Sequence, residues 1–141
     1  MKKSVIIVDD SKFLIRIMQE YFQEVMDFEV VATGVNGVQG VELYRKFRPD
    51  LISLDLTMPI KDGQTALSEI ISEFPQARVL IVSAVGGPSI LQCMKAGAKA
   101  YLEKPFRLED EDFRKDFKQT LLEIFAKSAS DGEAPGPGPG A

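Results

Sequence analysis

Three carboxylates stand directly after apolar runs in this sequence. Asp9 and Asp10 follow the β-branched run 5–8, and Asp55 follows the apolar run 51–54. Two ionised carboxylates 4 Å apart repel by about 4 kcal/mol at an effective dielectric constant of 20, so a cluster of three needs an opposing charge. Hard oxygen ligands of this kind suit Mg²⁺, and Mn²⁺ can substitute for it. The three residues are therefore candidate ligands of a divalent cation.

A hydroxyl and an ammonium group complete the candidate site. Ser83 and Lys104 each follow a further apolar run along the chain. A carboxylate such as that of Asp55 can accept a phosphoryl group as an acyl phosphate. A cation, an ammonium group and a hydroxyl around it would stabilise the charge of the transferring group. The sequence has no histidine, which excludes any catalytic triad that needs one.

The elements that would position these residues alternate along the chain. Apolar runs predict strands at 4–8, 28–33, 51–55, 78–83 and 100–102. Apolar stripes at helical spacing predict a helix after each strand, ending near residues 25, 47, 74, 97 and 127. In the first of these helices, Ser11 is the expected N-cap. Phe13, Met18, Phe22 and Val25 are expected on its core-facing stripe.

Five β–α units in strict alternation predict an α/β fold, with a five-stranded parallel sheet and helices on both faces. Right-handed crossovers leave few topologies, and we expect the flavodoxin-like strand order 2-1-3-4-5. In that order the first and third strands are neighbours, and ligands bind beyond their carboxyl ends. Asp9, Asp10 and Asp55 are therefore expected to meet there, with Ser83 and Lys104 on the adjacent strands.

Composition narrows the classes of function. The chain has 141 residues and a net charge of −4, with lysine and arginine scattered, so a single domain without nucleic-acid binding is expected. No apolar run approaches the ~20 residues of a membrane helix, and the N-terminal run is too short for a signal peptide. The single cysteine, Cys93, fits a reducing cytoplasm. We expect a cytoplasmic protein that does not insert into membranes.

The composition changes near the C-terminus. Residues 1–127 are expected to form the folded domain, and residues 128–141, rich in Ser, Gly and Pro, to be disordered. This segment is compatible with a native tail, the start of a linker or an expression remnant.

Taken together, these motifs resemble bacterial response-regulator receiver domains, most closely the CheY-like chemotaxis type. The resemblance runs from about Val5 to Phe125. It rests on Asp9-Asp10, on Asp55 with Met58-Pro59 and Gly63, on Ser83-Ala84, on Lys95-Ala96-Gly97-Ala98 and on Lys104-Pro105-Phe106. Each motif alone is weak, but their order and spacing together are specific.

The resemblance implies a role for each residue of the metal and phosphoryl site. Asp55 would be the phosphoacceptor and a metal ligand. Asp10 would bind Mg²⁺ directly and Asp9 mainly through water, with the backbone carbonyl of Thr57 as a further ligand. Lys104 would pair with the phosphoryl oxygens.

The resemblance also implies a switch. Ser83 would move toward the phosphoryl group, which the backbone at Ala84 would contact, and Tyr101 would turn inward in response. The peptide bond before Pro105 would be cis, as X-Pro energetics allow.

The expected partners come from the same resemblance. A CheA-like histidine kinase would be the phosphodonor, and the face of the fourth helix, fifth strand and fifth helix would bind a flagellar motor switch protein. A phosphatase of the CheX, CheC or CheZ type is a further expected partner, and a monomer the simplest state. The protein would be a signalling phosphoacceptor, catalysing only its own phosphotransfer and autodephosphorylation.

Three alternatives stay open at this point. The chain could be a receiver module cut from a multidomain transcriptional or enzymatic regulator. An Asp-nucleophile phosphatase would share the chemistry, but it would carry a second carboxylate two residues after the nucleophile, where this sequence has Thr57. A flavin carrier would share the fold, but Asp9 and Asp10 would repel the flavin phosphate.

Overall fold

Five strands alternate with five helices among the residues that the structure describes. The computed structural model describes residues 2–84 and 86–133. The strands are β1 (Ser4–Val8), β2 (Glu29–Gly34), β3 (Leu51–Asp55), β4 (Val79–Ser83) and β5 (Ala100–Glu103). The helices are α1 (Lys12–Glu24), α2 (Gly37–Phe47), α3 (Gly63–Glu73), α4 (Pro88–Lys95) and α5 (Glu111–Glu133). The predicted alternation is confirmed.

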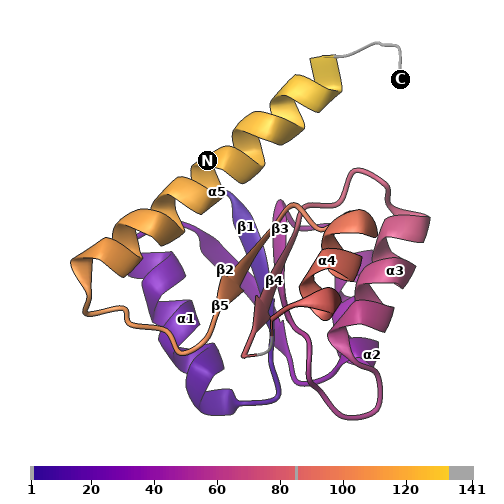
Figure 1. Ribbon diagram of the computed structural model, residues 1–141, viewed down its shortest axis with the longest axis horizontal. Coiled ribbons are helices and arrows are strands. Elements are labelled where there is room, and N and C mark those ends of the chain that lie inside the picture. Colours follow the sequence, from indigo (N-terminus) through magenta and orange to yellow (C-terminus); the bar gives the residue numbers. More distant parts are fainter. Residues whose placement is uncertain (1, 85, 134–141) are drawn as a thin grey trace. The chain divides into compact units, whose positions relative to one another are not determined.

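The strands form one parallel sheet in the order β2-β1-β3-β4-β5, as predicted. Val8 pairs with Leu54 across β1 and β3, and Asp55 pairs with Val82 across β3 and β4. The carboxyl ends of these three strands therefore lie at one edge of the sheet (Figure 1). Residues that directly follow the strands share that edge, where ligands bind in folds of this type.

Helices cover both faces of the sheet. The chain divides after Phe106 into two compact units, and the first contains β1 to β5 and α1 to α4. Within this unit α1 lies on one side of the sheet, whereas α2, α3 and α4 lie on the other (Figure 1). The central strands β3 and β4 are buried along their whole length, as is typical of the inner strands of a parallel sheet.

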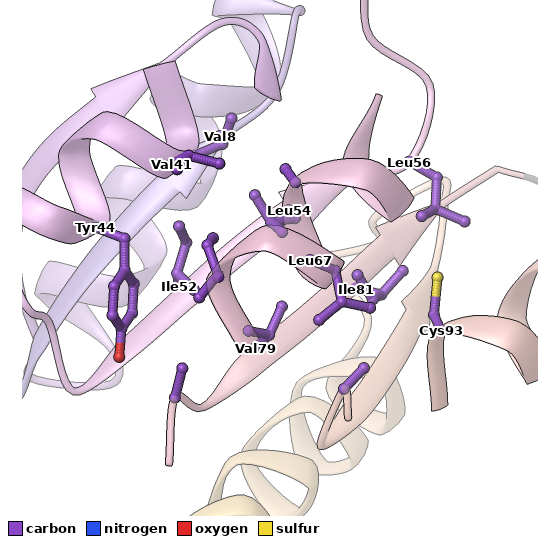
Figure 2. Close-up of a cluster of buried hydrophobic side chains, with 14 of the residues drawn as sticks. Val8, Val41, Tyr44, Ile52, Leu54, Leu56, Leu67, Val79, Ile81 and Cys93 are labelled. Atoms are coloured by element: carbon purple, nitrogen blue, oxygen red, sulfur yellow. The ribbon is translucent and has the colours of Figure 1, made fainter. Parts of the chain in front are cut away.

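The core on the α2–α4 side is built from alternate side chains of the central strands. Val8, Ile52, Leu54 and Ile81 meet apolar side chains from the three helices (Figure 2). The helical contributors that Figure 2 labels are Val41 and Tyr44 of α2, Leu67 of α3 and Cys93 of α4. Each fully buried side chain of this kind stabilises the fold by about 1.5–3 kcal/mol, so the strand ends stand on a rigid base.

The core-facing side of α1 differs from the prediction at both ends. Phe13 is 66% exposed and Val25 is exposed, whereas Met18 and Phe22 are buried as predicted. Ile15, which the stripe omitted, is buried instead. The buried stripe runs through Ile15, Met18 and Phe22, and at 3.6 residues per turn Phe13 lies on the other side of the helix from Ile15. Val25 is already the C-cap of α1.

Three helices of the first unit, α1, α2 and α3, begin at side-chain caps. The side chains of Ser11, Asn36 and Asp62 accept hydrogen bonds from the backbone N–H three residues further on, at 3.2, 2.9 and 2.8 Å. Ser11 was the predicted cap of α1. Each cap fixes the point at which a loop at the carboxyl edge of the sheet becomes a helix.

The second unit, beginning at Arg107, contains α5. Asp110 caps this helix by accepting the backbone N–H of Asp112 at 2.8 Å. Its backbone is helical to Glu133, within the segment 128–141 for which the sequence predicts disorder. The disorder of that segment stays a prediction. Residues 134–141, the rest of the predicted tail, lie outside the described residues. Neither α5 nor any other described helix is long and apolar enough to cross a membrane.

Candidate functional site: an acidic cluster with one lysine

Asp9 is held rigidly at the carboxyl end of β1. Its backbone N–H donates to the carbonyl of Gly34 at 3.0 Å, and its Oδ1 accepts the N–H of Ser11 at 2.9 Å. The side chain is buried, with 1% of the residue exposed, whereas the neighbouring Asp10 is exposed. The turn into α1 therefore presents one fixed carboxylate and one that solvent reaches.

Asp55 ends β3 beside this pair. It is only 4% exposed, and carboxylate oxygens of Asp9, Asp10 and Asp55 all lie within 4.8 Å of one another. Parallel pairing of β1 with β3 produces this meeting, because both strands end at the same edge. The three residues that the sequence singled out as candidate metal ligands are thus brought together.

Lys104 places its ammonium group between the two buried carboxylates. Its Nζ lies 2.9 Å from Oδ2 of Asp9 and 3.3 Å from Oδ1 of Asp55. Its backbone N–H donates to the carbonyl of Ser83 at 2.9 Å, which ties the end of β5 to the end of β4. The peptide bond from Lys104 to Pro105 is cis. One positive charge therefore reaches both β1 and β3 from the edge strand.

Burial and like charge act on the protonation of Asp55. Burial, followed by the negative charge of Asp9, raises the pKa of Asp55 to about 6, although Lys104 opposes the shift. Burial alone would lower the pKa of Lys104, but the adjacent carboxylates of Asp9 and Asp55 outweigh it and raise that pKa. At neutral pH the ammonium group is charged, and Asp55 is mostly a carboxylate that lacks full compensation.

The cluster has the features of a divalent-cation site. Oδ2 of Asp9 is buried and accepts no aligned hydrogen bond from the described residues, although Lys104 forms an ion pair with it. Three carboxylates and one ammonium group sum to a charge of −2, which a divalent cation would neutralise. All the side-chain donors are oxygens, the ligands that Mg²⁺ and Mn²⁺ prefer. The residues present therefore fit such an ion.

Gly63 lets the loop between β3 and α3 close tightly on the site. Its N–H donates to the carbonyl of Leu56 at 3.0 Å. A Cβ atom at this position would collide with the carbonyl oxygen of Asp55 and approach Leu56 Cα at 2.9 Å. Only glycine fits between the end of β3 and the start of α3, so the residue that the sequence marked as a breaker has a steric role.

Of the remaining predicted site residues, Ser83, Ala84 and Thr57 lie at or just beyond this edge, whereas Tyr101 lies near the start of β5. Ser83 is buried at the end of β4, and Ala84, next to it, is exposed. Thr57 is exposed two residues beyond Asp55. Tyr101 lies on the edge strand β5, with 44% of its surface exposed.

The ion pair between Lys61 and Glu69 was not predicted from the sequence. Lys61, in the loop between β3 and α3, forms an ion pair with Glu69 of α3 and accepts the N–H of Gly37 at its carbonyl, at 2.8 Å. Opposite charges eight residues apart give no periodic signal across a loop. Only the conformation of the loop brings them together.

A family model and individual relatives of known sequence identify the same protein family for this chain. A family model described as the response regulator receiver domain matches residues 5–114. The chain is 43% identical over 110 residues to the chemotaxis protein CheY of Bacillus subtilis, which covers 77% of the chain and 91% of that protein. It is 38% identical over 108 residues to CheY of Halobacterium salinarum, covering 76% of the chain and 88% of that protein.

A solved structure shows the same likeness in three dimensions. The structure of a CheX–CheY–BeF3–Mg²⁺ complex from Borrelia burgdorferi matches with a TM-score of 0.79 and 32% sequence identity. The match covers 87% of this chain and 89% of that chain. The sequence matches and the structural match thus agree on the same family, and the acidic cluster lies at the carboxyl edge of the sheet in this fold.

Proposed function

This chain belongs to the response regulator receiver domain family and is a CheY-like, phosphorylatable receiver; we propose that it accepts a phosphoryl group on Asp55 from a histidine kinase. The observation that carries this proposal is the meeting of Asp9, Asp10, Asp55 and Lys104 at one edge of the sheet. Asp55 is the acceptor because it ends the central strand β3 and contacts the ammonium group.

The chemistry follows from the charges. The Asp55 carboxylate attacks phosphorus, the bond to the donor's imidazole nitrogen breaks, and an acyl phosphate remains on the protein. A bound Mg²⁺ would neutralise the developing charge on the phosphoryl oxygens. Lys104, already 3.3 Å from Asp55, pairs with another of these oxygens, and the Ser83 hydroxyl and the N–H of Ala84 donate to the rest.

The proposed metal ligands are the side chains of Asp10 and Asp55, Asp9 through water, and the carbonyl of Thr57. Asp10 is the exposed member of the acidic pair, which suits an ion that keeps some of its water. The buried Oδ2 of Asp9 accepts no aligned hydrogen bond from the described residues, so it would accept one from such a water.

The proposed output is a change of binding surface. Ser83 moves toward the phosphoryl group, and the exposed Tyr101 ring turns inward. The new conformation at α4 and β5, with α5 as a further contributor, then binds a flagellar motor switch protein. The likeness to proteins named as chemotaxis proteins supports a role in chemotaxis. A phosphatase of the CheX, CheC or CheZ type would end the signal, and a CheA-like kinase would start it.

A beryllofluoride titration monitored by NMR tests the proposal. With Mg²⁺ present, we expect amide shifts to begin at residues 9, 10, 55, 83 and 104 and to extend to Tyr101. Asp55→Asn should abolish these shifts. Shifts of the same size in the variant, or none in the unaltered protein, would contradict the proposal.

The number of phosphate-ester molecules hydrolysed per protein molecule distinguishes a receiver from an Asp-nucleophile phosphatase. A phosphatase would release phosphate from simple phosphate esters through many cycles, whereas a receiver forms one acyl phosphate per chain and needs a further protein to lose it quickly. Thr57 supplies no carboxylate for protonating a leaving group. We therefore expect no sustained ester hydrolysis.

A further inference from the structure

The loop between β3 and α3 is fixed at several points along its length. Leu56 and Met58 are buried in the core on either side of the exposed Thr57. Further along, the N–H of Gly63 returns to the carbonyl of Leu56 at 3.0 Å. The backbone that carries the Thr57 carbonyl is therefore anchored before and after that residue.

The tip of this loop has an unfavourable conformation. Ile60 has a φ of 71°, and the N–H of Lys61 donates to the carbonyl of Pro59 at 2.7 Å across it. A three-residue turn with positive φ is rare and strained, and a β-branched residue makes it worse. The side chain of Ile60 is 82% exposed, so burial of its apolar surface does not compensate. Contacts of neighbouring residues must hold this turn in place.

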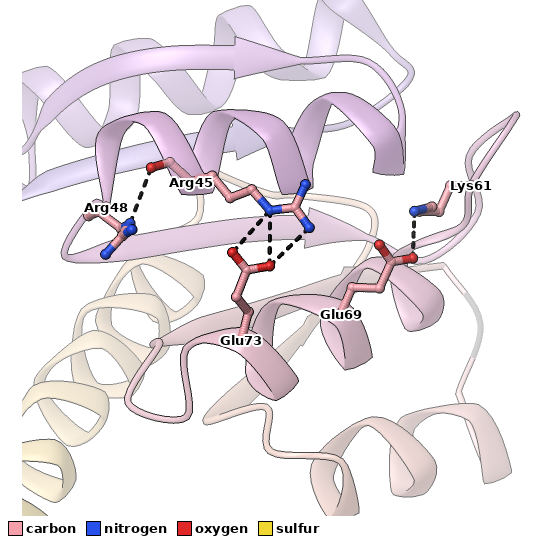
Figure 3. A network of polar contacts seen from close by, with 5 residues as sticks. All are labelled: Arg45, Arg48, Lys61, Glu69 and Glu73. Carbon is pink, nitrogen blue, oxygen red and sulfur yellow. Dashed lines mark hydrogen bonds and ion pairs between the residues drawn. The ribbon is translucent and has the colours of Figure 1, made fainter.

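Lys61 makes these contacts on two sides. Its carbonyl accepts the N–H of Gly37, the first residue of α2, at 2.8 Å. Its ammonium group forms an ion pair with Glu69 on α3, and both side chains are partly shielded from solvent. Figure 3 shows this pair at the loop, apart from the second ion pair that joins α2 and α3, between Arg45 and Glu73.

We propose that Lys61 is a positioning residue for the divalent-cation site: its ion pair with Glu69 holds the strained loop so that the backbone carbonyl of Thr57 is presented before the ion arrives. This inference rests on the proposed function, because it assumes that the carbonyl is a ligand. A ligand that is already in position loses less conformational freedom on binding, so the ion binds more tightly.

If Lys61 acted only through its charge, its removal would increase the affinity for Mg²⁺, whereas loss of a positioning role would decrease it. The two effects can therefore be told apart. Removing an ammonium group near an acidic site strengthens the attraction of that site for a cation. Removing a group that positions a ligand weakens binding. Lys61→Met keeps most of the side-chain length and removes the charge, so the direction of the change in affinity distinguishes the two effects.

The experiment is a Mg²⁺ titration by isothermal calorimetry and by amide NMR shifts, with unfolding in EDTA measured beside it. We expect Lys61→Met to bind Mg²⁺ about two- to fivefold more weakly, the range that a partly exposed ion pair supports. Lys61→Arg should restore most of the affinity, because a guanidinium group can still pair with Glu69. The Gly37 amide should exchange with solvent faster in Lys61→Met, because its acceptor lies in the released loop.

Arg45→Met is the matched control. It removes one positive charge and breaks the neighbouring ion pair with Glu73, but it leaves the loop untouched. It should bind Mg²⁺ as tightly as the unaltered protein or slightly more tightly. Loss of affinity equal to that of Lys61→Met would overturn the inference, since any break between α2 and α3 would then suffice.

Asp9→Asn separates this inference from the proposed function. If Asp9→Asn weakens Mg²⁺ binding but Lys61→Met binds as tightly as the unaltered protein, the positioning role is wrong and the metal site stands. If Asp9→Asn leaves Mg²⁺ binding unchanged, the proposed metal site is wrong, and the positioning role falls with it.

Discussion

The ammonium nitrogen of Lys104 lies 2.9 Å from Oδ2 of Asp9, a buried carboxylate oxygen that accepts no aligned hydrogen bond from the described residues. The two residues are far apart in the sequence. They meet because each follows the end of a strand, β1 or β5, and both strands end at the same edge of the sheet. A single lysine thus compensates part of the charge of three carboxylates. The rest of that charge is available for a divalent cation and for catalysis.

Removing the charge of Asp55 should stabilise the metal-free protein. Its pKa of about 6 exceeds its ordinary value of 3.8, so the folded state holds this proton more tightly than the unfolded state. Stability from this group is fully present below pH 4 and is lost as the pH rises through 6. In EDTA at pH 7.5, Asp55→Asn should therefore raise the free energy of unfolding by about 1–3 kcal/mol.

Chemical denaturation at several pH values measures this effect. The gain of Asp55→Asn should shrink toward zero near pH 4 and should also shrink when Mg²⁺ is added at pH 7.5. A gain that is independent of pH would show that the carboxylate charge is not its source.

Lys104→Met should destabilise the metal-free protein by about 3–5 kcal/mol, because it leaves Asp9 and Asp55 buried without their counter-charge. Saturating Mg²⁺ should recover a large part of the loss, since the ion takes over compensation of the same carboxylates. Thermal unfolding in EDTA and in Mg²⁺ gives the comparison. An equal loss in both buffers would mean that Lys104 acts through packing alone.

Gly63→Ala should lower the free energy of unfolding by about 1–3 kcal/mol, because the added methyl group overlaps the backbone at Asp55. It should also weaken Mg²⁺ binding, since the strand end that carries Asp55 must shift. Gly86→Ala is the matched control. A Cβ atom there would meet nothing within 4 Å, and its stability should change by less than about 0.5 kcal/mol.

Calorimetric unfolding and Mg²⁺ titration of the two alanine variants test this prediction. Equal stability and equal Mg²⁺ affinity for both variants would show that the backbone gives way at Gly63 without strain.

The acyl phosphate should be long-lived without a phosphatase. Neither Thr57 nor Val85 carries the carboxylate or carboxamide that could orient an attacking water molecule. Thr57→Asn should speed spontaneous hydrolysis roughly tenfold, because its carboxamide can hold that water near the phosphoryl group. Loss of phosphate after removal of the donor measures the rate. A half-life of a second or less in the unaltered protein would contradict the account.

The central part of the fold was predictable from the sequence because it depends on burial. The run 51–54 is apolar except for Ser53 and precedes Asp55, so the pattern predicts a strand that ends at Asp55, and its observed bounds match. Parallel topology then placed Asp9 and Asp55 together without any knowledge of side-chain contacts. Hydrophobic periodicity and handedness rules are sufficient for this level of detail.

Details at element ends were less predictable. Phe13 fits an apolar helical spacing in α1 but lies on the side of the helix away from the buried Ile15 and Phe22. The pairing of Lys61 with Glu69 depends on a strained turn at Ile60 that propensities disfavour. Such features are decided by tertiary contacts, which a single sequence does not encode as a pattern.

The most direct test of the account is to locate the phosphoryl group. The protein is incubated with acetyl phosphate and Mg²⁺, and intact mass and peptide mapping follow at once. We predict the addition of one phosphoryl group, on Asp55. It should be absent when EDTA removes the Mg²⁺ and absent in Asp55→Asn. It should be retained in Asp50→Asn, because Asp50 lies at the other end of β3, where its carboxylate accepts the N–H of Ser4. Addition to another residue, or undiminished addition to Asp55→Asn, would contradict the account.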